Sequence, residues 1–168
     1  MYLPVAFHFS VSLDSAFGPS PRGADIDASF QEVSGIRVEL GSEAVEEGGE
    51  NRFVHRLPTA AKYADLVLKR GVVVEDSPLA KWVGETLATN LAKPIVPRDI
   101  FVTLRNAEQA PLILWTFVNA YPVQWETSPM NAMESAILTE TMHFSFHYFE
   151  RVVYSPPKNG DQDAAGNP

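Results

Sequence analysis

Apolar and polar residues alternate one by one over several stretches of this chain, which is the pattern of a β-strand with one buried face. In the first stretch, residues 3–13, every second residue is apolar and lies on one face: Leu3, Val5, Phe7, Phe9, Val11 and Leu13. The alternation returns over 140–154, which we expect to be one long strand. Several half-buried strands need a common core, so the pattern favours an antiparallel β-sandwich or barrel.

Two further alternating runs, 99–105 and 112–120, are separated by a short polar link. This arrangement predicts a β-hairpin. Tyr121-Pro122 is expected to bend the chain after the second strand and to separate it from a short extended piece at 123–125.

A single segment has clear helical spacing. Ser77-Pro78 predicts its start, because a serine can cap free N–H groups and proline suits the first turn. Leu79, Trp82, Val83 and Leu87 then follow at helical intervals. We expect a helix of about 12 to 15 residues. The fold class is therefore mainly β (α+β), an antiparallel β-sandwich or barrel with one packed α-helix.

The region between residues 29 and 71 is expected to hold strands around a long acidic loop. Residues 15–28 should connect to it, and a strand should begin at Phe30 with a bulge or bend at Ser34-Gly35. The alternation stops at Gly41, where we expect a polar loop running to His55. The remaining expected features are a short helical turn at 42–47, strands at 52–57 and 63–69, and a break at Leu57-Pro58-Thr59.

Composition restricts the possible functions. The 168 residues suit one domain, predicted over 1–154, followed by a flexible Pro-, Gly- and Asp-rich tail at 155–168. The absence of cysteine excludes disulfides and thiolate metal sites, and a net charge of −8 argues against a nucleic-acid-binding surface. No apolar run approaches the ~20 residues that a membrane span needs. The N-terminus lacks a basic signal-peptide region, so synthesis in a cytoplasm is expected.

No catalytic motif stands out. The chain has no P-loop, GxSxG or HExxH pattern, and its carboxylate pairs lie in predicted loops. His143 and His147 would share a strand face but lie about 13 Å apart, too far to bind one metal ion. We therefore expect no enzymatic activity, no metal and no cofactor.

Three motifs in order carry a family resemblance. They are FQEVSGI at 30–36, LVLKRG at 66–71, and the Phe117, Ala120, Pro122 and Trp125 pattern. Together they resemble the inner tube proteins of contractile phage tails and related injection systems, over residues 3–151. The last strand, HFSFHYFE, departs from the family pattern. It leaves two alternatives open, a main tube subunit and a variant that starts the tube at the baseplate.

The resemblance implies a tail-tube fold and a non-enzymatic structural role. Six copies would form a ring in which strands close a continuous barrel, and rings would stack into a tube inside a contractile sheath. The implied partners are sheath, baseplate and cap proteins, with a cargo effector or DNA in the channel. The particle would be a phage tail or an injection particle, extracellular or cytoplasmic. Sequence-specific nucleic-acid binding is not expected.

Charge segregation suggests where the rings would meet. Between residues 24 and 50 the chain has eight acidic residues against Arg37 alone, which fits either a solvated loop or a surface facing a basic partner. The hypothetical inter-ring residues are the acidic Glu43, Glu46, Glu47 and Glu50 and the basic Arg52, Lys62, Lys69 and Arg70. The hypothetical lumen-facing residues are polar members of strands: His8, Ser10, Ser12, Thr103 and Arg105.

Two other functions remain alternatives at this point. One is a monomeric small-molecule-binding β-barrel with an apolar interior. The other is a secreted effector or enzyme domain whose active site the sequence does not reveal.

Overall fold

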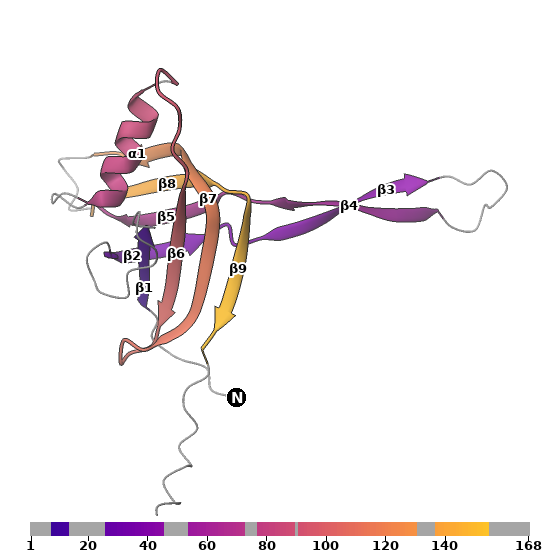
Figure 1. Cartoon of the computed structure of the whole chain (residues 1–168). Coiled ribbons are helices and arrows are strands. Elements are labelled where there is room, and N and C mark those ends of the chain that lie inside the picture. Colours follow the sequence, from indigo (N-terminus) through magenta and orange to yellow (C-terminus); the bar gives the residue numbers. More distant parts are fainter. Residues whose placement is uncertain are drawn as a thin grey trace, which may run out of the picture.

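The structure is a computed structural model that describes residues 8–13, 26–45, 54–72, 77–89, 91–130 and 137–154. The described residues form a β-barrel, a helix packed on the barrel, and a long two-stranded ribbon that extends away from it (Figure 1). The elements are β1 (His8–Leu13), β2 (Ile26–Ser34), β3 (Val38–Val45), β4 (His55–Tyr63), β5 (Leu66–Gly71), α1 (Pro78–Ala88), β6 (Arg98–Arg105), β7 (Pro111–Thr127), β8 (Thr139–Ser145) and β9 (Tyr148–Val153).

The barrel closes because the long strand β7 is shared between neighbours. The sheet order is β6-β1-β2-β5-β8-β7-β9, and β6 also pairs with β7. The first part of β7 lies between β6 and β9, whereas residues 121–127 pair with β8. All of these pairings are antiparallel. Six strands therefore form a closed barrel, and within the described ranges β9 pairs only with β7.

Alternation along the strands produces the core. Where β1 pairs with β6, Val11 lies opposite Val102 and Leu13 opposite Ile100, and all four side chains are buried. Leu66 and Leu68 of β5 and Met142 and Phe144 of β8 are fully buried in the same cluster. The inner face of the barrel is thus filled with packed aliphatic and aromatic side chains.

The helix begins and packs as its sequence predicts. The Ser77 hydroxyl accepts a hydrogen bond from Ala80 N at 3.1 Å, and Pro78 occupies the first turn. Leu79, Trp82 and Val83 face the barrel. The Trp82 ring stacks on Phe144 with 5.8 Å between ring centroids. The helix is slightly shorter than expected, at 11 residues.

β3 and β4 form the ribbon, which we call the arm (residues 38–45 and 55–63). Figure 1 shows the arm projecting from the barrel on the side opposite α1. The arm continues the β2–β5 pair outward, and Val38 pairs with Tyr63 at its base. A register shift between Leu40 and Ser42 gives β4 one extra residue near Pro58.

The base of the arm is fixed by backbone geometry and by aromatic packing. Gly35 has φ of 83°, and Ala64 N donates to the carbonyl of Arg37 at 3.2 Å. The Tyr63 ring lies 5.7 Å from Phe146 and 5.8 Å from Phe149, measured between centroids. The chain therefore leaves the barrel at a fixed turn, beside an aromatic cluster.

Several predicted boundaries are wrong. β2 starts at Ile26, inside the expected 15–28 connection. The expected helical turn and the first part of the expected loop are strand β3 as far as Val45, and β4 runs through Pro58 without a break. β7 likewise runs through Pro122 to Thr127. The arm boundaries were wrong because its strands are exposed on both faces and so show no alternation. β7 continues through Pro122 because a register shift in its pairing with β8 accommodates the proline.

The expected long C-terminal strand is two strands. β8 ends at Ser145 and β9 starts at Tyr148, so the chain turns at Phe146-His147. Alternation continues across that turn because Phe146 remains in the core. The predicted tail at 155–168 and residues 46–53 lie outside the described residues.

Candidate assembly surfaces

The arm is the first candidate surface, because it exposes apolar side chains over its whole length. Every residue of β4 is exposed, and in β3 only Gly41 is partly covered. One face of its base carries Val38, Leu40, Ala61 and Tyr63, which lie opposite one another in the register. Leu40 is 71% exposed. A ribbon of two strands with no second layer is marginally stable alone, so this surface suits a partner.

The predicted inter-ring residues are only partly brought together. Glu43 and Lys62 lie on the arm, where Glu43 is opposite Leu57 and Lys62 is opposite Glu39. Lys69 lies in β5 of the barrel and is half-buried. Glu46, Glu47, Glu50 and Arg52 are outside the described residues.

The prediction for Arg70 is wrong, because its side chain is only 1% exposed and belongs to an internal network. Its Nε donates to Glu140 Oε1 at 2.5 Å, and its guanidinium also donates to the Ser77 hydroxyl at 2.9 Å. Trp125 Nε1 donates to the second oxygen of Glu140 at 3.1 Å. A buried charge must be paired, and here the pairing connects β5, β7 and β8 with the start of α1.

The predicted lumen-facing residues occupy one face of the β1–β6 pair. His8 pairs with Arg105 and Ser10 with Thr103, while Ser12 is in phase on the same side of β1. Arg105 Nε donates to the Ser10 hydroxyl at 3.0 Å. The register extends this face across β7 to β9, where Thr103 is opposite Leu114 and Leu114 is opposite Val152. The four strands therefore present one continuous outer face that is partly polar.

β9 also leaves an edge open in the described part of the chain. It pairs with β7 on one side, and no other described strand lies along its second side. Tyr148, Val152 and Val153 of this strand are exposed. An unpaired edge beside exposed apolar side chains is a template for pairing with another chain.

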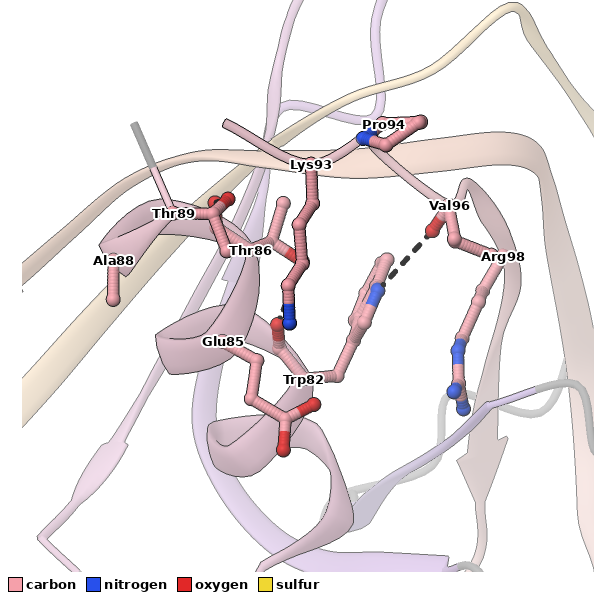
Figure 2. A pocket seen from close by; sticks show the side chains of 9 residues that line it. All are labelled: Trp82, Glu85, Thr86, Ala88, Thr89, Lys93, Pro94, Val96 and Arg98. Atoms are coloured by element: carbon pink, nitrogen blue, oxygen red, sulfur yellow. Dashed lines mark hydrogen bonds between the residues drawn. The ribbon is translucent and has the colours of Figure 1, made fainter. Parts of the chain in front are cut away.

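A concave groove at the end of α1 is a further candidate surface, and the sequence analysis did not predict it. Figure 2 shows the side chains around this cavity of about 550 Å³, which come from the second half of α1 and from residues 93–98. Trp82 Nε1 donates to the carbonyl of Val96 at 3.2 Å and holds the two walls together. The guanidinium of Arg98 lies 5.8 Å from the centre of the Trp82 ring. Its two basic residues, Lys93 before β6 and Arg98 at the start of β6, form no recognisable sequence motif.

Neither the histidines nor the acidic residues form a metal site in the described ranges. His147 Nδ1 lies 3.3 Å from the Asn119 side-chain nitrogen, and His143 lies on β8. Within 8–13, 26–45, 54–72, 77–89, 91–130 and 137–154, no three His, Asp or Glu side chains cluster as metal ligands. In the same ranges, no helix has the length and apolarity to span a membrane.

Solved structures of other proteins share this architecture. The chain aligns structurally with a subunit of the anti-feeding prophage baseplate, with a TM-score of 0.74 and 26% identity, covering 91% of this chain and 98% of the other. A subunit of the PVC extracellular contractile injection system sheath–tube complex aligns with a TM-score of 0.71 and 18% identity, covering 91% and 93%. Hcp1 from Flavobacterium johnsoniae aligns with a TM-score of 0.53 and 16% identity, covering 86% and 94%.

No curated protein matches the sequence significantly. The sequence profile of the family described as "T4-like virus tail tube protein gp19" matches residues 5–150. That match spans the barrel, the helix and the arm. The chain therefore belongs to the T4-like virus tail tube protein family.

Proposed function

We propose that this protein is a non-enzymatic subunit of an inner tube, and that it forms hexameric rings that stack around a central cargo channel. The arm is the observation that carries the proposal. Its two strands expose apolar residues, and no other described element covers them. A two-stranded ribbon is marginally stable alone, so these residues suit contact with a second copy.

The outer face and open edge of the barrel support the same assembly. The β1-β6-β7-β9 face bears Ser10, Thr103 and Arg105, polar groups suited to a water-filled channel. The unpaired side of β9 offers backbone groups to a neighbouring copy, and a closed ring of copies would remove such edges. Ring closure and channel lining would therefore involve the same sheet.

The partners follow from the proteins that this chain resembles. The similar structures come from a baseplate, a sheath–tube complex and a tube-terminating cap. By analogy, the tube proposed here would contact sheath, baseplate and cap proteins and belong to a phage tail or an injection particle. Its cargo would be an effector protein or DNA.

The two alternative functions have less support. A ligand-binding barrel needs an open apolar interior, whereas this barrel holds Phe117, Met142 and Phe144 packed at full burial. The sequence contains no P-loop, GxSxG or HExxH motif that would favour an enzyme.

The test is the state of assembly in solution. Light scattering over a range of concentrations, followed by negative-stain electron microscopy of the same sample, should reveal six-membered rings or tubes with a central hole. A monodisperse monomer at high concentration, even with a baseplate extract added as template, would contradict the proposal.

A further inference from the structure

The groove at the end of α1 has the surface chemistry of a docking site. Val96, which lines it beside Pro94, is 63% exposed. Lys93 and Arg98 line it, and neither forms an ion pair with any described residue. Figure 2 shows both cationic side chains on the walls of the cavity, on opposite sides of the Trp82 ring, with Glu85 as the acidic residue of the lining. The groove therefore combines an apolar rim with basic groups available to an acidic partner.

The outer half of the arm has the complementary chemistry. Glu43 and Val45 point to the same face of β3, and Leu57 and His55 lie opposite them on β4. Glu43 has no ion-pair partner among the described residues, unlike Glu39, which pairs with Arg37. Leu57 is 55% exposed. The connecting sequence beyond Val45 adds Glu46, Glu47 and Glu50 against Arg52. This face presents an acid beside apolar side chains, the counterpart of the groove.

The positions of the two surfaces determine which copies can meet. The arm and α1 lie on opposite sides of the barrel (Figure 1), so the arm cannot reach the groove of its own chain. A contact between them must join two copies and must be heterologous, with different surfaces on each side. Heterologous contacts repeat from copy to copy, and they either close into a ring or propagate as a filament. A tube of stacked rings contains contacts of both kinds: some close each ring, and others repeat from one ring to the next.

We propose that the groove between α1 and residues 93–98 receives the outer half of the arm of a second copy, with Glu43 of one chain facing Lys93 and Arg98 of the next. The inference rests on the proposed tube function and names the receiving surface, for which the sequence had suggested Arg52, Lys62, Lys69 and Arg70. The structure has Arg70 buried and Lys62 on the arm itself. The α1 groove provides two basic residues that lie outside the arm and line an open cavity.

Cysteine cross-linking tests the contact directly, because the chain contains no cysteine. The double variant Glu43→Cys/Lys93→Cys, assembled and then oxidised, should give a reducible ladder of linked chains on denaturing gels. The matched control is Glu43→Cys/Glu108→Cys, which keeps the arm cysteine and moves the second one to the exposed β6–β7 turn. That control should remain monomeric on the gel.

Charge exchange gives an independent readout. Lys93→Glu should raise the concentration needed for assembly about fivefold or more, the effect of losing an ion pair of about 1 kcal/mol. Adding Glu43→Lys to that variant should restore at least part of the loss, whereas Glu39→Lys should not.

The outcomes separate the two proposals. Normal rings or tubes without a 43–93 ladder, or a Lys93→Glu variant that assembles like the parent, would overturn the groove assignment and leave the tube function standing. Failure of the unmodified chain to form rings or tubes under any condition tested would overturn both.

Discussion

At the scale of single residues, two positions in the family-like motifs have clear physical roles. Gly35, in the FQEVSGI motif, has φ of 83°, and a Cβ on it would lie 1.8 Å from the carbonyl oxygen of Asp65. Arg70, in the LVLKRG motif, is buried against Glu140 and lies 5.3 Å from the centre of the Phe30 ring. Gly35 fixes the approach of β2 to β5 at the base of the arm. Arg70 fixes β5 against the start of α1.

Gly35→Ala should lower the free energy of unfolding by about 2 kcal/mol or more, because it adds both a left-handed backbone conformation and a steric clash. Gly84→Ala is the matched control. Its Cβ would meet Trp125 at an ordinary contact of 3.4 Å, and alanine favours the helix by up to about 1 kcal/mol. Urea denaturation measures both variants. Equal stability of the two would contradict the role assigned to Gly35.

The Arg70–Glu140 pair should show strong coupling. Arg70→Met or Glu140→Leu alone leaves a buried charge unpaired and should cost about 3–5 kcal/mol, whereas the double variant should lose clearly less than the sum. The exposed Arg37–Glu39 pair is the control, and its loss should cost under about 1 kcal/mol. A double-mutant cycle by denaturation gives these values. Additive losses at Arg70 and Glu140 would show that the pair is not coupled.

At the scale of elements, the sequence predicted the strands and the helix that have one buried face. It predicted only part of the arm, which has no buried face. The β6–β7 hairpin and α1 were predicted because alternation and a Ser-Pro cap mark them directly. A loop was predicted from Gly41 to His55 and a break at Leu57-Pro58-Thr59, because a ribbon exposed on both faces is under no pressure to alternate. The candidate groove was missed for a related reason, because it joins a helix end to a linker that no periodicity describes.

Trimming the arm separates its role from that of the barrel. Leu40 and Ala61 lie directly opposite each other, so residues 41–60 can be replaced by an Asn-Gly turn. The trimmed chain should keep the circular dichroism and nearly the melting temperature of the parent, because the core residues lie outside the deletion. It should fail to form rings or tubes by light scattering. An unfolded product would show that the arm supports the barrel, and normal assembly would show that the contact lies elsewhere.

At the scale of the whole molecule, one long strand decides how the surfaces are placed. β7 pairs with β6 and β9 through its first part and with β8 through its last, so it connects the outer face to the side that carries α1. The arm then extends away from α1, on the far side of the barrel. A subunit built this way has a projecting element, a groove on the opposite side and a broad sheet between them. This layout allows every copy to be both donor and receiver.

The assignment of the β1-β6-β7-β9 face to the channel predicts a change in reactivity on assembly. Val152 lies on that face, in register with Leu114 and through it with Thr103, and its side chain is exposed in the single chain. A Val152→Cys variant should therefore react with a small maleimide in both the dissociated and the assembled state. A maleimide carried on a globular protein should label it only when dissociated, because a channel wall excludes bulky reagents while water and small solutes still reach it.

The reaction is followed by mass on denaturing gels, with the small reagent as the control for an intact thiol. Equal labelling of assembled tubes by the bulky reagent would place this face on the outside, and the channel would then have to be lined by another part of the barrel.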